Sequence, residues 1–310
     1  MKLATVIFWA IIIVPLTLTA QTDYRYNFER YTNEQGLSQG QVFDIDQDKT
    51  GQIWIATYSG GITILDGQAE KYLSVKDGMP SYSTTSLFLD DNDHMWIGTA
   101  NGPCYYDGYS IKTPVIKEPI KKLFVWDIAD DKHNQIWLAT DQGIWYVKND
   151  TVYVADQSIL QYPFYKISKQ PETGRLWFCS GVAGLKILEN NTIINADIPF
   201  SRDVLIEKLL FTSKDHAYVA TTMGLYECSV DGNKLNILSR RIPGRHAITM
   251  DVDKDGRLWV GTDENGIYIF DKNGNSSWYL RIKCPNAQSI ALSFDKFYLP
   301  ESGKLMIRES

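Results

Sequence analysis

A short apolar run centred on an aromatic residue recurs along the chain at nearly constant spacing. In the first copy, residues 52–57, Trp54 lies between two isoleucines, and the later copies place an aromatic residue at the same position. These residues are Trp54, Trp96, Trp137, Trp177, Tyr218 and Trp259, and the steps between them are 42, 41, 40, 41 and 41 residues. A repeat of this length predicts a tandem array of one structural unit.

Each unit contains four short segments with strand character, separated by polar turns. In the first unit these segments are 42–46, 52–57, 61–65 and 70–75. The second is apolar at consecutive positions, as expected for a strand buried on both faces, and no apolar stripe of helical spacing is sustained. Four strands within about 41 residues are the dimensions of one β-propeller blade.

The two ends of the chain are expected to meet in one blade. Residues 27–36 match the outer strand and turn of a unit, although they precede the first complete unit. Near the other end, an inner strand is expected at 289–298 and a counterpart of the tryptophan strand at 305–308, with the third strand absent. The prediction is an all-β, seven-bladed β-propeller of four-stranded blades, its last blade incomplete and closed by the N-terminal outer strand. An incomplete blade suggests a fragment of a longer protein or a truncated product.

Residues 1–20 have the features of a secretory signal peptide. Lys2 precedes an apolar run from 3 to 18, and Thr19-Ala20 lies directly before a polar stretch. Leu18 is large for its place before a cleavage site, so an N-terminal membrane anchor is the alternative, although a bilayer span needs roughly 20 residues. The expected division is a signal peptide at 1–20 and a propeller domain at 21–310, in the periplasm or otherwise outside the cytoplasm.

Charge and cysteine content narrow the classes of partner. The net charge is -6, and a nucleic-acid-binding protein needs a concentrated basic surface, so no nucleic-acid partner is expected. The cysteines match no zinc spacing and fall in different repeats, which favours buried free thiols over a disulfide. They are Cys104, Cys179, Cys228 and Cys284.

The repeat resembles a known family. Its pattern of an aromatic and an aliphatic residue, Gly or Ala, Thr, and a glycine three residues later is best preserved at 53–67, 95–108 and 258–271. Gly36-Leu37-Ser38 and Gly78-Met79-Pro80 resemble the Gly-Leu-Pro/Ser turn that opens each repeat of this family. On these residues, and over 27–310, the chain resembles the two-component regulator propeller repeat. In that family, propellers form the periplasmic sensor half of hybrid two-component receptors of gut Bacteroidetes, which often respond to glycan fragments.

The resemblance implies a ligand-sensing module that is not itself an enzyme. Any histidine kinase activity would belong to sequence downstream of this chain. The implied partners are a small-molecule or oligosaccharide ligand and a second propeller or a receptor homodimer, with membrane contact only through the signal segment, an anchor or missing downstream sequence. Two other classes stay open: a secreted propeller lyase or hydrolase, and a protein-interaction scaffold.

Aspartate-rich turns recur in the units and invite a metal-binding interpretation. Residues 251–256 resemble the start of a calcium loop, but Thr262 stands where the twelfth position requires glutamate. Because similar segments occur at 46–51 and 90–93, turn formation explains them better. His94, His133 and His216 occupy this same turn in separate repeats, so a shared metal is not expected. No cofactor, metal site or catalytic residue is predicted.

The loops on one face are the expected ligand site. Turns between first and second strands, and between third and fourth, lie on one face of a propeller, and the loops on the other face vary between these repeats. The candidate ligand-binding residues are Tyr58, Tyr82, Lys122, Tyr162, Arg202, Arg245 and His246. The four basic residues among them would favour an anionic ligand such as an acidic glycan. The opposite face is expected to repel it through Asp46, Asp90, Asp91, Asp130, Asp251 and Asp253.

Overall fold

The computed structural model describes residues 29–31, 33–39, 41–66, 69–117, 122–201, 203–253, 255–263, 266–271, 276–280, 291–293, 296–301 and 304–308. The expected signal peptide, Arg202 and Cys284 lie outside these residues. Within them the helices are single 3-10 turns, η1 (Asn33–Gln35), η2 (Val75–Asp77) and η3 (Gln157–Ile159). No helix in this part of the chain has the length and apolar character of a membrane span.

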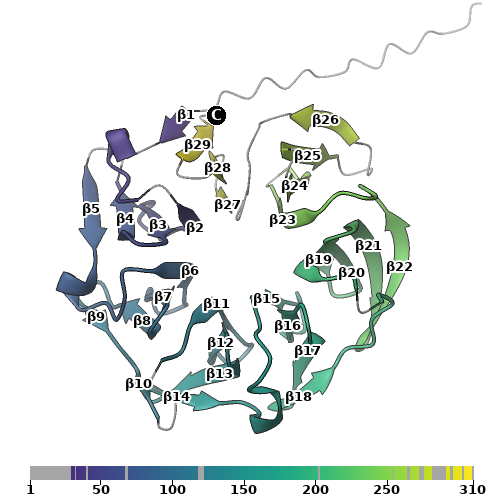
Figure 1. Ribbon diagram of the computed structural model, residues 1–310, viewed down its shortest axis with the longest axis horizontal. Coiled ribbons are helices and arrows are strands. Elements are labelled where there is room, and N and C mark those ends of the chain that lie inside the picture. The colour runs from purple at the N-terminus through teal and green to yellow at the C-terminus, as the bar shows by residue number, and fades with distance from the viewer. Residues whose placement is uncertain are drawn as a thin grey trace, which may run out of the picture.

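Six antiparallel blades, each formed by one continuous stretch of chain, are arranged in a ring (Figure 1). In each blade the first strand lies nearest the ring axis and the fourth lies at the periphery. Blade 1 contains β2 (Val42–Gln47), β3 (Ile53–Thr57), β4 (Gly61–Leu65) and β5 (Glu70–Leu73). Blade 2 contains β6 (Thr84–Leu89), β7 (Met95–Thr99), β8 (Gly102–Tyr106) and β9 (Ile111–Lys112). Blade 3 contains β11 (Val125–Asp130), β12 (Ile136–Thr140), β13 (Gly143–Lys148) and β14 (Thr151–Val154).

The remaining three continuous blades follow the same order of strands. Blade 4 contains β15 (Lys166–Lys169), β16 (Leu176–Ser180), β17 (Gly184–Glu189) and β18 (Thr192–Asn195). Blade 5 contains β19 (Ile206–Ser213), β20 (His216–Thr221), β21 (Gly224–Asp231) and β22 (Lys234–Arg240). Blade 6 contains β23 (Ala247–Val252), β24 (Leu258–Thr262), β25 (Gly266–Phe270) and β26 (Ser276–Leu280). Blade 3 also carries a strand that the sequence did not predict, β10 (Val115–Ile116), which pairs in parallel with β14.

A composite four-stranded sheet joins the two ends of the chain. Its order is β1-β29-β28-β27, with β1 (Glu29–Tyr31), β27 (Ala291–Ser293), β28 (Lys296–Glu301) and β29 (Lys304–Arg308). Arg30 of β1 lies opposite Met306 of β29, and β27 lies beside β2 and β23. The predicted pairing of the N-terminal strand with the C-terminal segment is confirmed.

The prediction of an incomplete last blade is wrong. The structure shows six blades that are continuous in sequence, where seven were predicted, and a composite sheet that already has four strands. In this sheet β28 is the second strand and β29 the third, so residues 305–308 are not the counterpart of the tryptophan strand. The two middle strands of a blade are easily confused because both are buried: β3 is buried throughout and β4 at four of five positions.

An acceptor side chain six or seven residues before the tryptophan of the repeat fixes the turn between the first two strands. Asp48 Oδ1 accepts hydrogen bonds from the Thr50 and Gln52 amides at 2.9 and 3.0 Å, and Oδ2 accepts from the Trp54 indole at 2.9 Å. The equivalent acceptors elsewhere are Asp90, Asp131, Gln170 and Asp253. Turn formation as the role of the aspartate-rich segments is confirmed, and the indole bond explains their spacing from the tryptophan.

The threonine that ends the tryptophan strand fixes the loop on the opposite face. Thr57 is fully buried, and its hydroxyl donates to the Gly61 carbonyl at 2.9 Å. Gly61 has a φ of +72°, and a Cβ there would lie 2.2 Å from the Leu73 carbonyl oxygen, so this position requires glycine. The same hydroxyl-to-carbonyl bond recurs in blades 2, 3 and 5. A constant base therefore supports loops whose other residues vary.

The apolar core lies between neighbouring blades. Trp177 and Trp259 are almost completely buried, and Trp177 packs against Phe211 of the next blade with ring centroids 5.5 Å apart. Cys104, Cys179 and Cys228 are buried free thiols, as predicted. Burial raises the pKa of Cys104 to about 12, which is the behaviour of an inert core thiol.

Candidate functional site

A β-bulge inserts one extra residue at the start of five inner strands. The register shifts by one residue at the beginning of β2, β6, β11, β19 and β23. The inserted residues are Phe43, Thr85, Trp126, Glu207 and Ile248. Bulges re-aim side chains, and these five lie at the end of the inner strand that follows a blade-to-blade connection. They therefore belong to the face expected to bind ligand.

Aromatic side chains gather at two of these bulges. Trp126 lies 4.2 Å from Phe124 and 5.5 Å from Tyr165, measured between ring centroids. At blade 1, Phe43 stacks on Tyr58 at 5.8 Å. Apolar ring surface is thus available on this face close to the inner strands.

In blades 1 and 3 the residue after the bulge is an aspartate that bonds a backbone amide of the next blade. Asp44 accepts from the Leu87 amide of blade 2 at 2.8 Å, and Asp127 accepts from the Ile167 amide of blade 4 at 2.8 Å. Burial raises the pKa of Asp44, an effect that Lys166 partly offsets. Burial of Lys166 disfavours its ammonium, but Asp127 and Asp44 outweigh this and leave its pKa raised. These charges are engaged with one another and with backbone amides, which indicates a structural role.

The described members of the predicted ligand set lie in loops of the expected face, at several different blade junctions. Tyr58 and Tyr82 are 46% and 47% exposed, and both lie at the junction of blades 1 and 2, where the Gly61 amide donates to the Tyr82 carbonyl. Lys122 and Arg245 are exposed in the loops before β11 and β23, three blades apart. Arg202 lies outside the described residues.

His246 is held between two carboxylates. Its Nε2 lies 2.8 Å from Glu207 Oε1, and its Nδ1 lies 3.3 Å from Asp263 Oδ2. The Asp263 amide in turn donates to the His246 carbonyl at 3.3 Å. Because both ring nitrogens already face acidic partners, this imidazole neither adds unpaired positive charge to the face nor offers a free nitrogen for proton abstraction.

A cavity of about 900 Å³ opens on the expected face between blades 4 and 5. Tyr162 of the predicted set lines it, together with the loop 180–184 and residues from the segments 196–201 and 203–205 of the blade-to-blade connection. Val182 is 74% and Leu205 41% exposed, and polar atoms come from Asn195, Ser180 and Ser201. Val182, Leu205 and Phe200 were not predicted as site residues, although they are apolar residues in variable loops.

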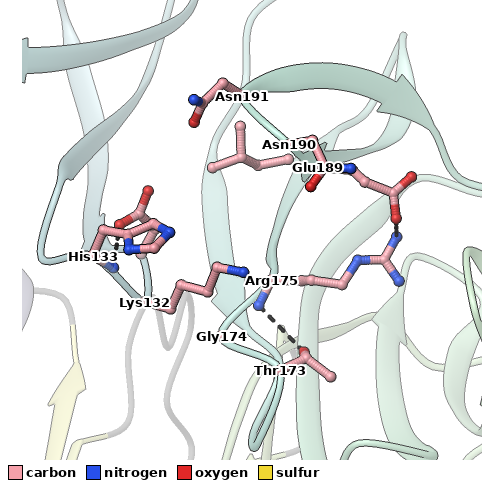
Figure 2. A pocket seen from close by; sticks show the side chains of 10 residues that line it. Lys132, His133, Thr173, Gly174, Arg175, Glu189, Asn190 and Asn191 are labelled. Carbon is pink, nitrogen blue, oxygen red and sulfur yellow. Dashed lines mark hydrogen bonds and ion pairs between the residues drawn. The ribbon is translucent and has the colours of Figure 1, made fainter.

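A second hollow lies on the opposite face, between blades 3 and 4. Figure 2 shows Lys132 and His133 from one side of it and Asn190 and Asn191 from another, with Arg175 paired to Glu189. Its volume is about 510 Å³. The lining comes from the turns β11–β12, β15–β16 and β17–β18. This face was expected to repel anions, yet three basic residues lie here.

Comparison with known proteins agrees with the resemblance seen in the sequence. Three segments, 36–59, 78–101 and 242–264, match the two-component regulator propeller family. Histidine kinase P4 of Formosa agariphila is 34% identical over 86 residues, which cover 24% of this chain and 6% of that protein. The chain thus shares repeats with a much longer protein.

Solved structures share the fold at low sequence identity. The extracellular domain of the hybrid two component system BT3049 from B. thetaiotaomicron superposes with a TM-score of 0.73 at 19% identity, covering 92% of this chain and 42% of that one. Virginiamycin B lyase from Staphylococcus aureus superposes with a TM-score of 0.74 at 13% identity, covering 92% and 100%. At these identities the likeness shows the propeller fold alone.

Proposed function

We propose that this chain, three segments of which match the two-component regulator propeller family, is the extracytoplasmic ligand-sensing propeller of a two-component signalling receptor. The observation that carries the proposal is the match of three separate repeats to that family. The signalling output would come from a histidine kinase encoded outside this chain. The propeller itself would bind a ligand without converting it.

We place the ligand in the cavity between blades 4 and 5. Its volume of about 900 Å³ is that of a small-molecule site, and its variable loops stand on a constant scaffold. Tyr162 and Phe200 offer apolar surface for the carbon face of a sugar ring, while Asn195 and Ser201 can hydrogen-bond hydroxyl groups. This combination suits a short glycan fragment.

A lyase or hydrolase is the competing function, because streptogramin lyases have the same fold. The histidine nearest the inner strands on this face argues against it. His246 is saturated by Glu207 and Asp263, so a general base at this position would first have to lose a carboxylate partner.

The test is calorimetric titration with neutral and uronic-acid oligosaccharides of two to six units, followed by mass spectrometry of the recovered ligand. We expect one or more to bind and to be recovered unchanged. Tyr162→Ala and Val182→Asp should each weaken binding about tenfold or more, as expected for loss of a central contact. The matched control is Tyr109→Ala, because Tyr109 is 94% exposed in the β8–β9 turn on the opposite face.

Absence of binding to the whole panel, or equal loss of affinity in Tyr162→Ala and Tyr109→Ala, would contradict the placement. Cleaved products in the recovered ligand would favour the enzyme. Thermal melting of each variant shows whether the fold is retained, and the exposed Val182 makes Val182→Asp the safer of the two changes.

A further inference from the structure

We infer that the groove between blades 3 and 4, on the face opposite the proposed ligand site, binds a small saccharide carrying a carboxylate or another anionic group. The hollow of about 510 Å³ shares Asp131, His133 and Asn191 with a neighbouring hollow of about 390 Å³. The two therefore form one groove, which begins at the hairpin turns and continues between the sheets toward Lys148 and Tyr146. Both volumes lie in the range of small-molecule sites.

An internal comparison between blade junctions shows why this groove is open. Lys49 follows the turn aspartate of blade 1, and its ammonium pairs with Asp93 in the turn of blade 2. Lys132 follows the turn aspartate of blade 3, but the residue of blade 4 that corresponds to Asp93 is Gly174. Glycine offers no carboxylate, so the ion pair of the first junction has no counterpart here.

Gly174 also brings the two turns close together. Its φ is +65°, and a Cβ built on it would lie 2.7 Å from the Cβ of Lys132. A side chain at this position would push Lys132 away, whereas glycine lets the Lys132 chain lie against the neighbouring turn. Figure 2 shows the Lys132 side chain extending into the hollow from this contact.

Hydrogen-bond donors without partners line the groove. Among the described residues, no hydrogen-bond or ion-pair partner is present for the side chains of Lys132, His133, Lys148, Asn190 and Asn191. The turns of other blades differ, since His94 lies 3.2 Å from Asp90 and Arg257 bonds Asp253 and Asp255. These five side chains are exposed, so an external acceptor can bind them without displacing a partner within the described part of the protein.

The carboxylates of the groove are already occupied. Asp131 accepts from the His133 and Gln135 amides and from the Trp137 indole. Glu189 pairs with Arg175 at 2.9 Å, and Arg175 also donates to the Gly232 carbonyl at 2.9 Å. With histidine neutral, the lining counts three cations against two carboxylates, so one positive charge remains uncompensated.

These features define the ligand class. The ammonium groups of Lys132 and Lys148 suit an anionic group, and the amides of Asn190 and Asn191 can bond hydroxyls as donors or acceptors. Stacking of a neutral sugar is not favoured, because Tyr146 is already stacked on Tyr153 at 5.6 Å and tilted against Trp137 at 5.4 Å. Recognition by charge-assisted hydrogen bonds therefore predicts a sugar acid.

The test is a calorimetric titration with glucuronate and a glucuronate disaccharide, using glucose as the neutral counterpart. We expect the acids to bind and glucose not to bind. Lys132→Ala should weaken binding about tenfold, as for loss of one charge-assisted hydrogen bond, and raising the salt concentration should weaken it further. Lys49→Ala is the matched control, since it removes a lysine from the equivalent position at a junction where Asp93 neutralises it.

Failure of both acids to bind, equal binding of glucose, or equal effects of Lys132→Ala and Lys49→Ala would overturn the inference. Loss of acid binding in Val182→Asp, with Lys132→Ala unaffected, would assign the acid to the cavity between blades 4 and 5 instead. Lys132 is exposed, so both lysine variants are expected to melt at the temperature of the unchanged protein.

Discussion

Replacing Asp46 by asparagine should stabilise the propeller at neutral and higher pH. Asp46 lies on the inner strand β2, and its carboxylate accepts from the Gln47 amide at 2.8 Å. Burial, reinforced by the nearby Asp44, raises the pKa of Asp46 from 3.8 to about 7 in spite of this bond. The folded protein therefore resists ionisation of Asp46, which the unfolded chain undergoes freely.

The size and sign of the effect on the free energy of unfolding follow from the linkage between proton binding and folding. Between pH 3.8 and 7 the folded state holds a proton that the unfolded state has released, so the free energy of unfolding falls as pH rises through this window. A pKa of Asp46 that is roughly 3 higher in the folded than in the unfolded state lowers the free energy of unfolding by about 4 kcal/mol at most. Because the side chain keeps partial contact with solvent, we expect about 1–3 kcal/mol. Asparagine keeps an acceptor oxygen for the Gln47 amide but carries no charge.

The assay is urea unfolding at pH 5, 6, 7 and 8. Wild-type stability should decrease across this series, with Asp44 and Asp251 contributing because burial raises the pKa of each. Asp46→Asn should match wild type near pH 5 and exceed it at pH 8. Asp91→Asn, at an exposed turn position, should leave the profile unchanged. A wild-type profile that rises with pH, or no gain from Asp46→Asn at pH 8, would refute the reasoning.

Three further results are expected. Asp131→Ala should lower the free energy of unfolding by about 2–4 kcal/mol, because it leaves the buried Trp137 indole and two backbone amides without an acceptor. Asp131→Asn should lower it less. Melting temperatures equal to that of wild type for both variants would show that Asp131 does not stabilise this turn. Truncation through Tyr31 should lower the melting temperature because it exposes the β29 edge of the composite sheet, and an unchanged melting temperature would contradict a stabilising role for the β1–β29 pairing. Burial raises the pKa of Cys179 to about 12, so peptide mapping should find Cys104 and Cys179 unmodified by iodoacetamide at pH 8 until the protein unfolds; rapid labelling of the native protein would contradict their burial.

The repeat could be recognised in the sequence because its recurring residues make the same hydrogen bonds in successive blades. Trp54 needs its indole acceptor at Asp48, and Thr57 needs the Gly61 carbonyl, so the same residues return in each blade. The last unit has no tryptophan, and its second and third strands give similar apolar runs. The position of each strand within the repeat therefore could not be read at residues 289–308, and the strand assignment there was wrong.

The candidate sites depend on contacts between residues that are distant in sequence, which residue spacing does not predict. The position of Tyr162 in the repeat placed it on the face of the blade-to-blade connections, where the structure has it. The cavity beside it, however, depends on how residues 196–201 and 203–205 fold against the loop 180–184. The groove depends on the absence of a side chain at Gly174 opposite Lys132, a contact between residues of different blades. His246 looked like a free cation because its partners Glu207 and Asp263 are distant in sequence.

The most direct test of the sensor proposal is hydrogen exchange, followed by mass spectrometry, with and without the tightest-binding oligosaccharide of the panel. We predict slower exchange in the loop 180–184 and the connection 196–201, and recovery of the ligand chemically unchanged. Unchanged exchange in both segments under saturating ligand, or recovery of a cleaved ligand, would contradict it.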